Sequence, residues 1–207
     1  MSVPAGGPRV TAADLPRLER SLRGRPGRPA QPEGPVREAA VALVLRPAPP
    51  DDALELLFIK RAEYEGDPWS GHVAFPGGRR EADDPSLEHT ARRETLEELA
   101  LDLAADGRLL GVLDDLHPRT PVLPPIVVRP FVYALERDVL LAPSAEVAVA
   151  FWVPVADLLR PGAKVSTTVR ARGRELLVSS FRHDGHVIWG MTERIIKTFL
   201  DHLLSDA

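Results

Sequence analysis

Residues 75–98 read FPGGRREADDPSLEHTARRETLEE, and this stretch decides the fold prediction. It starts at the end of an apolar run, passes two adjacent glycines and an acidic segment, and continues into a pattern with helical periodicity. We expect a helix from about Pro85 to Leu101, because small and apolar positions recur every three to four residues: Leu87, Ala91, Thr95 and Leu99. The stretch therefore predicts a strand, a glycine turn, an acidic loop and a helix, in that order.

The end of this helix places three glutamates, Glu94, Glu97 and Glu98, on one face. Like charges at this spacing destabilise a helix by about 0.2–0.5 kcal/mol per pair, so a compensating cation is expected. One candidate is Arg93, one helical turn from Glu97, and the other is a divalent ion, since carboxylate oxygens suit Mg²⁺ or Mn²⁺. On its own such a pattern is more typical of a solvated charged face, so the surrounding sequence has to decide.

The sequence on either side alternates between strand-like and helical patterns. Runs rich in Val, Leu and aromatic residues predict strands over residues 36–47, 53–62, 107–116, 126–135 and 146–155. Helical patterns are expected over residues 12–23, 155–161 and 191–205, and a hairpin over 168–189. This irregular order favours an α/β or α+β sandwich over a doubly wound array.

Composition and length exclude several classes of protein. A chain of 207 residues with 44% hydrophobic residues can bury a full core, and the absence of cysteine excludes disulfides, thiolate zinc sites and cysteine nucleophiles. The N-terminus lacks a signal-peptide pattern, and the longest apolar run, at 39–45, is too short to cross a bilayer. We expect a cytoplasmic protein without a membrane partner, with a proline-rich and arginine-rich N-terminal arm over 1–35 and one domain over 36–207.

The net charge of −4 is unevenly distributed. Residues 81–98 hold seven acids and two arginines, a net of −5, which leaves +1 for the rest of the chain. A mildly acidic total gives no general attraction to nucleic acid, so no nucleic-acid partner is expected. The concentration of acids indicates one cation site on a nearly neutral body.

The cassette of strand, glycine turn, acidic loop and helix resembles the Nudix hydrolase box. That box has a glycine, five residues, a glutamate, seven residues and then Arg-Glu-apolar-x-Glu-Glu-x-Gly-apolar. The matching positions are the opening glycine, the Arg-Glu pair, the Glu-Glu pair and the final apolar residue: Gly78, Arg93, Glu94, Glu97, Glu98 and Leu101.

This chain departs from the box in three places. The spacing from the opening glycine to Arg93 is one residue longer, Ala100 replaces the late glycine, and Thr95 occupies the first apolar position. The middle acidic position falls on Asp84 or, counted back from the Arg-Glu pair, on Pro85.

The resemblance implies an α/β/α sandwich around a mixed β-sheet, and an enzyme that hydrolyses a nucleoside diphosphate linked to another moiety. It implies Mg²⁺ or Mn²⁺ as cofactor, because metal ions neutralise the anionic diphosphate and position the attacking water. The residues that it assigns to the metal are Glu94, Glu97, Glu98 and the carbonyl of Gly78.

The resemblance also implies the catalytic set. Arg93 is expected to orient a carboxylate, and Glu94 and Glu97 are expected to act together with the metal. The general base stays open between a helix glutamate and a loop carboxylate, for which Glu146 is the candidate. Glu146 is equally typical of an ordinary acid at the edge of a strand.

Within the family, the chain resembles the coenzyme A diphosphatase group in the longer box and in two segments, 56–78 and 188–192. Residues 69–72, WSGH, replace the His-x-Gly-Gln element of that group. The resemblance spans about 36–204 and leaves ADP-ribose or a nucleoside triphosphate as alternative substrates, and a non-catalytic nucleotide-binding module as an alternative function. It also leaves open a homodimer.

Several residues near the box are candidates for substrate binding. Arg61 and Arg80 can each bind phosphate through bidentate hydrogen bonds or lie at the surface without a ligand. His72 beside the glycines either faces the substrate or ends a strand. Trp69 and Trp189 either stack on a base or belong to the core.

Overall fold

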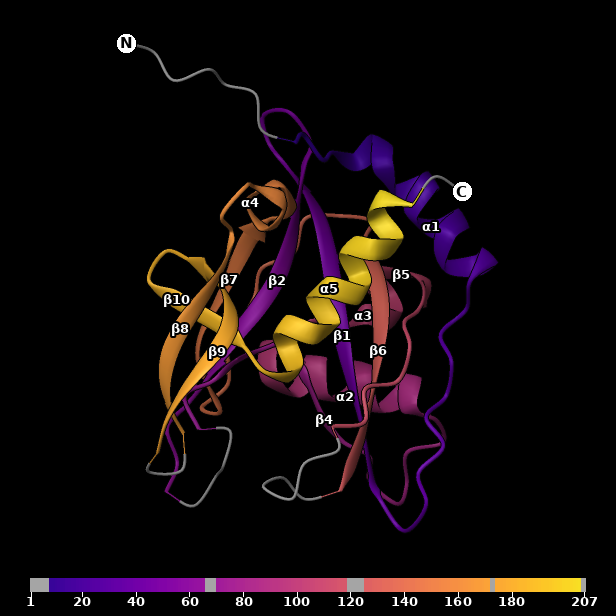
Figure 1. The fold of residues 1–207 in the computed structure, drawn as a ribbon. Coiled ribbons are helices and arrows are strands. Elements are labelled where there is room, and N and C mark those ends of the chain that lie inside the picture. The colour runs from indigo at the N-terminus through magenta and orange to yellow at the C-terminus, as the bar shows by residue number, and fades with distance from the viewer. Residues whose placement is uncertain (1–7, 66–69, 119–124, 172–173, 206–207) are drawn as a thin grey trace.

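The computed structural model describes residues 8–65, 70–118, 125–171 and 174–205. Its centre is a mixed sheet (Figure 1) in which β1 pairs parallel with β6 and antiparallel with β2. The strand order is β3-β2-β1-β6-β5, with β4 added to β1 and β7 added to β2. The strands of this sheet are β1 (Arg37–Ala48), β2 (Ala53–Arg61), β3 (Val73–Ala74), β4 (Gly77–Arg79), β5 (Gly107–Val112), β6 (Ile126–Leu135) and β7 (Val147–Pro154).

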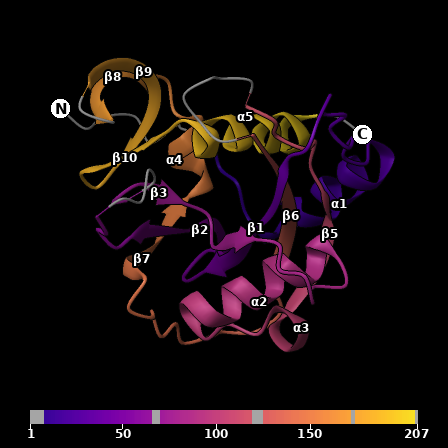
Figure 2. The same ribbon diagram turned by 90° about the horizontal axis from the view of Figure 1, so that it is seen from below.

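Both faces of the sheet are covered, as Figure 2 shows in the view along it. One face packs against α2 (Leu87–Leu99) and α3 (Leu103–Asp106). The other packs against α1 (Leu15–Gly24), which follows the short helix η1 (Ala12–Asp14), and against α4 (Val155–Leu159) and α5 (Met191–Leu204). A second sheet of β8 (Lys164–Ala171), β9 (Arg174–His183) and β10 (His186–Trp189) covers the same face. The layers confirm the predicted α/β sandwich with a mixed sheet.

The central strand β1 explains why its sequence is a nearly continuous apolar run. Its residues alternate between two cores: Leu43 and Leu45 point to the α5 side, and Ala42 and Val44 point to the α2 side. A strand buried on both faces has no solvent side and therefore loses the polar alternation of an edge strand. The glycine turn of the box is attached to this strand, because β4 pairs with β1 at Ala39, Ala40 and Val41.

The predicted box helix is confirmed as α2, which begins after Ser86 and ends at Leu99. The Ser86 side chain accepts a hydrogen bond from the backbone N–H of His89 (3.1 Å), which satisfies a free donor at the helix N-terminus. The predicted stripe faces the core: Leu87, Ala91, Thr95 and Leu99 are all buried.

The prediction for residues 168–189 is wrong in extent. The structure has three antiparallel strands there instead of one hairpin, because β8 begins at Lys164 and pairs with β9 along its whole length. The sequence KVSTTVR alternates β-branched and polar residues, which suits a strand exposed on one face. The short helix α3 was not predicted either, since four residues carry no period.

The described part of the N-terminal arm packs along the domain. Leu18 and Leu22 are buried in the core beside α5, and the N–H of Gly27 donates to the carbonyl of Val112 (3.1 Å). Arg28 pairs with Asp114 (2.7 Å). The boundary at residue 35 stays a prediction. Within the described residues, every helix is too short or too polar to cross a membrane.

Candidate active site

The turn between β3 and α2 depends on two glycines. Gly77 has a φ of +144°, a conformation that strains other residues, and a side chain there would overlap the carbonyl of Ala40. At Gly78 a side chain would overlap the carboxylate of Glu94. Both positions bring the backbone of β4 into direct contact with its neighbours, and Gly78 lies against the carboxylate face of α2.

A buried acid in the loop fixes the box arginine. Asp84 is only 3% exposed, and its Oδ1 and Oδ2 accept hydrogen bonds from Arg93 Nε and Nη2 (both 3.1 Å). Its Oδ2 also accepts from Thr90 Oγ1 (2.9 Å) and from the N–H of Glu81 (3.0 Å). These bonds, Arg93 first, hold the pKa of Asp84 far below its usual value. Of the two candidates for the middle acidic position of the box, Asp84 and Pro85, it is Asp84 that contacts Arg93.

The same arginine contacts two of the three helix glutamates. Arg93 Nη1 donates to Glu97 Oε2 (2.9 Å), and Nη2 donates to Glu94 Oε1 (3.0 Å) and to the carbonyl of Arg79 (3.1 Å). The sequence predicted the contact with Glu97 from the helical spacing, but not the chain of contacts that begins at Asp84. Arg93 thus links the acidic loop, the glycine turn and the carboxylate face of α2.

The third glutamate has opposite electrostatics. Glu98 is 3% exposed, accepts a hydrogen bond from the N–H of Gly77 at Oε2 (2.9 Å), and lies 3.9 Å from Arg61 Nη1. Burial raises the pKa of Glu98 to about 8, and the negative charges of Glu94 and Glu146 also raise it. The hydrogen bond from Gly77 and the positive charge of Arg61 lower the pKa but do not offset this rise. Asp84 is stabilised as an anion, whereas Glu98 lacks enough positive charge around it.

Glu94 shares this deficit, and the charge of Glu146 contributes to it. Burial raises the pKa of Glu94; Arg93 opposes the rise, and the charges of Glu97 and Glu146 strengthen it. Glu146 itself is exposed and precedes β7, and its carbonyl accepts a hydrogen bond from the N–H of Ala62 (2.8 Å). The loop acid therefore lies within electrostatic reach of the carboxylate face of α2, although it comes from a distant part of the sequence.

These acids fit a divalent cation by their chemistry. Glu94, Glu97 and Glu98 offer hard carboxylate oxygens, which Mg²⁺ and Mn²⁺ prefer. Two of the three have raised pKa values that a bound cation would lower again. Among the described residues, no group of three His, Asp or Glu side chains already stands in a ligating arrangement. The three glutamates of α2 therefore supply suitable donor atoms on one face of the helix.

The end of α2 is held by the segment that leads to Glu146. The N–H groups of Ala142 and Ser144 donate to the carbonyls of Leu99 (2.9 Å) and Glu98 (2.8 Å). Ala100, which replaces the glycine of the box, adopts the left-handed conformation with φ 53° and ψ 28°. The late glycine of the box thus corresponds to a backbone requirement that this chain meets with a strained alanine.

The residues predicted to bind substrate lie in three different environments. Arg61 faces the carboxylates through Glu98. Arg80 donates to Glu38 Oε2 (2.9 Å) and to the carbonyl of Asp84, so its contacts hold the acidic loop. The ring centroid of His72 lies 4.7 Å from that of Trp189. Trp69 lies outside the described residues.

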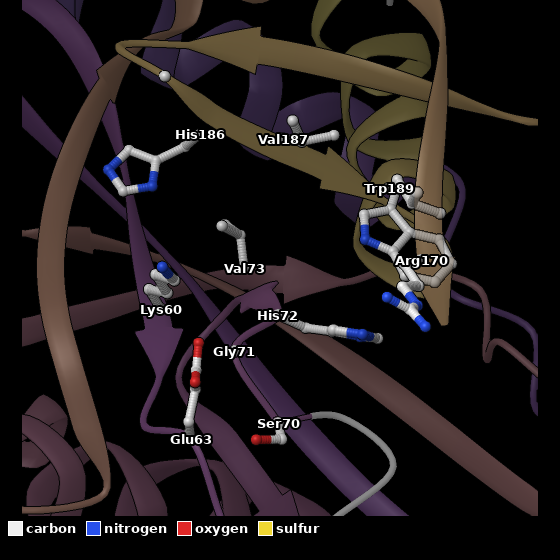
Figure 3. A pocket seen from close by; sticks show the side chains of 12 residues that line it. Lys60, Glu63, Ser70, Gly71, His72, Val73, Arg170, His186, Val187 and Trp189 are labelled. Atoms are coloured by element: carbon white, nitrogen blue, oxygen red, sulfur yellow. The ribbon is translucent and has the colours of Figure 1, made fainter. Parts of the chain in front are cut away.

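His72 and Trp189 line a cavity of about 300 Å³ between the end of β2 and the second sheet (Figure 3). The sequence did not reveal that Lys60, Arg170 and His186 also line this cavity. The only signal for Lys60 in the sequence is its position next to Arg61, because neighbouring residues of a strand point to opposite faces of the sheet. Arg170 and His186 carried no local pattern.

Most of the chain is similar to known proteins. The family model for the NUDIX domain matches residues 36–172 of this chain. The chain is 35% identical over 164 residues to an uncharacterized Nudix hydrolase, NudL, of Cronobacter sakazakii, covering 78% of this chain and 80% of that protein.

Two further similarities are more limited. An uncharacterized protein of Schizosaccharomyces pombe, C14C4.10c, is 39% identical over 110 residues, which cover 51% of this chain but only 33% of that protein. The crystal structure of a MutT/nudix family protein from Enterococcus faecalis aligns with a TM-score of 0.53 at 18% identity, covering 92% of this chain and 73% of that one. At this identity the structural match shows the fold alone.

Proposed function

The chain belongs to the Nudix family of hydrolases, which act on pyrophosphate bonds, and we propose that it is a metal-dependent diphosphatase of coenzyme A or an acyl-coenzyme A. One observation carries the choice of substrate. The two segments that resemble coenzyme A diphosphatases, 56–78 and 188–192, lie far apart in the sequence and meet in the structure. His72 packs on Trp189, and Thr192 Oγ1 donates to the carbonyl of Val73 (3.0 Å).

The proposed metal ligands are Glu94, Glu97 and Glu98 with the carbonyl of Gly78. When bound, Mg²⁺ or Mn²⁺ supplies charge neutralisation at the diphosphate oxygens and lowers the pKa of a bound water. The protein's own contribution is positioning. Asp84 fixes Arg93, Arg93 fixes Glu94 and Glu97, and the N–H of Gly77 fixes one oxygen of Glu98.

The general base is proposed to be either Glu146 or one of the helix glutamates. Glu146 is exposed and close enough to raise the pKa of Glu94 and Glu98, so it can accept a proton from a water beside them. Arg61, which already faces Glu98, is proposed to contact the diphosphate oxygens. Arg80 and His72 stay predicted substrate contacts.

A substrate panel tests this proposal. The protein is incubated with Mg²⁺ or Mn²⁺ and coenzyme A, acetyl-coenzyme A, ADP-ribose or a nucleoside triphosphate, and products are identified by mass. We expect coenzyme A to give phosphopantetheine and adenosine bisphosphate. Turnover of ADP-ribose or a triphosphate with coenzyme A left intact would contradict the substrate. No turnover of any compound would favour a non-catalytic nucleotide-binding module, although all three box glutamates are present.

A cytoplasmic location and a homodimer stay predictions. Cell fractionation tests the location, which rests on the cysteine-free composition. Light scattering of the purified protein tests the homodimer by giving the mass of the particle in solution, against 22.6 kDa for one chain.

A further inference from the structure

The cavity behind the end of β2 has no role in the metal site. It lies between residues of the β2–β3 segment, such as Lys60 and Val73, and residues of the second sheet, such as Arg170 and Val187. In Figure 3, Lys60 and His186 lie on one side of the cavity, and Arg170 and Trp189 lie on the other. Its volume, about 300 Å³, is at the lower end of the range for small-molecule sites.

The cavity is cationic. Within the described chain, neither the Lys60 ammonium nor the Arg170 guanidinium forms an ion pair, and Glu63 is the only acid in the lining. Burial lowers the pKa of His186, and the charge of Lys60 lowers it further. Two cations that line one cavity without a described anionic partner favour an anionic ligand there, and Arg in particular suits phosphate.

Flat rings form part of the wall. The Trp189 ring lies beside His72 at 4.7 Å, and the His186 ring stacks on Phe151 at 4.1 Å with an angle of 11°. Such rings are fixed by their neighbours and offer faces on which a planar base can stack. The cavity therefore combines two features of a nucleotide site, cations for phosphate and rings for a base.

The cavity shares a wall with the carboxylate site. Lys60 and Glu63 line the cavity, and the two residues between them contact the other site. Arg61 lies 3.9 Å from Glu98, and the N–H of Ala62 donates to the carbonyl of Glu146 (2.8 Å). One substrate can therefore reach from the carboxylates into the cavity around the end of β2.

We propose that this cavity binds the phosphoadenosine end of the substrate, with the positive charge of Lys60 and Arg170 favouring the phosphate monoester of its ribose and Trp189 against its base. The inference rests on the proposed function, because coenzyme A carries such a monoester in addition to its diphosphate. The pantetheine half of coenzyme A is uncharged and does not match a cavity lined by two cations. Dephospho-coenzyme A, which lacks only the monoester, is the discriminating compound.

The first test measures binding without turnover. Calorimetry in EDTA compares adenosine bisphosphate with adenosine monophosphate on the wild-type protein, on Lys60→Ala/Arg170→Ala, and on Lys197→Ala/Arg23→Ala, which removes one lysine and one arginine outside the cavity. We expect the wild type and the control to prefer the bisphosphate by about tenfold or more, and the cavity variant to lose this preference. Equal affinity of the wild type for both compounds overturns the inference.

The second test measures kcat/KM for coenzyme A and dephospho-coenzyme A. We expect the cavity variant to lower the ratio of the two values by about tenfold, and the control variant to leave that ratio at its wild-type value. Equal loss on both compounds, or no loss, overturns the inference. If the wild type cleaves neither compound but the bisphosphate preference depends on Lys60 and Arg170, the proposed function fails and the cavity assignment stands.

Discussion

The end of β2 lies between two regions of opposite charge: the carboxylate face of α2 on one side and the cavity lined by Lys60 and Arg170 on the other. The two regions differ in how far their charges are paired within the protein. On the α2 side, Arg93 contacts Asp84, Glu94 and Glu97, yet Glu98 stays short of positive charge. On the cavity side, the cations of Lys60 and Arg170 have no ion pair with a described residue. Each side therefore has an excess of one charge. We propose that a metal ion balances the first side and that a phosphorylated substrate balances the second.

The largest expected effect comes from removing a carboxylate on the α2 side. Glu97→Gln or Glu98→Gln keeps the shape of the side chain and removes one negative donor, so we expect turnover to fall by roughly 10²-fold or more. Steady-state kinetics with saturating Mn²⁺ measures the loss. Glu136→Gln, at an exposed position away from α2, is the matched control and should keep wild-type activity. Full activity in both box variants would move the metal site elsewhere.

Asp84→Asn removes the carboxylate that pairs with Arg93. The variant would leave an arginine of the α2 side without its main anionic partner, as on the cavity side. Breaking a buried ion pair costs about 3–5 kcal/mol, so the midpoint of thermal unfolding should fall by roughly 6–20 °C. Calorimetry measures the change. Asp83→Asn, the exposed neighbour, should unfold like the wild type.

The same variant gives a pH dependence with a defined sign. The pKa of Asp84 is lower in the folded protein than its ordinary value of 3.8, so its contribution is present above about that pH. As the pH falls below 3.8, the unfolded chain binds the proton first and the contribution is lost. The stability gap between the wild type and Asp84→Asn should therefore be constant near neutral pH and shrink in acid. A constant gap down to acid pH would contradict the ion-pair account.

Gly78→Ala tests whether close approach of the backbone to Glu94 matters for the α2 side. The added methyl group would overlap the carboxylate, so Glu94 has to move, at a cost of about 1–3 kcal/mol for overpacking. We expect lower Mn²⁺ affinity as well as lower stability. Gly34→Ala, where a side chain meets open space, is the control. Unchanged Mn²⁺ affinity in Gly78→Ala would show that Glu94 is not a ligand.

The smallest effect is expected at the end of α2, where neither charged side changes. Ala100→Gly removes the strain of the left-handed conformation, so we expect a gain of about 1 kcal/mol and a midpoint higher by roughly 2–4 °C. Ala104→Gly, in the right-handed helix α3, should instead lose stability. A loss in Ala100→Gly would mean that the alanine side chain contributes packing that outweighs its strain.

The α2 side could be predicted from sequence because it is nearly continuous. One segment of 24 residues, 75–98, contains the glycine turn, Asp84, Arg93 and the glutamates, and helical spacing brings the last four together. The five longer strands of the main sheet were predictable for a related reason, since burial on one or both faces leaves a local pattern, whereas β4 falls in the stretch predicted as a glycine turn.

The cavity side could not be predicted. Its residues come from 60–73 and 169–189, and only the pairing of the second sheet and its packing beside β3 bring them together. Arg80 shows the same limit, because a sequence rich in arginine does not reveal that this one binds Glu38 and the loop carbonyl of Asp84. Contacts between distant segments leave no spacing to read.

We propose that the carboxylates of α2 recruit a metal ion for cleavage of the diphosphate of coenzyme A. The most direct test of this proposal follows the products of coenzyme A by mass, first in EDTA and then during titration with Mn²⁺. We expect no cleavage in EDTA and equal amounts of phosphopantetheine and adenosine bisphosphate once Mn²⁺ is in excess. Cleavage that persists in EDTA, or products that leave the diphosphate bond intact, would contradict the proposal.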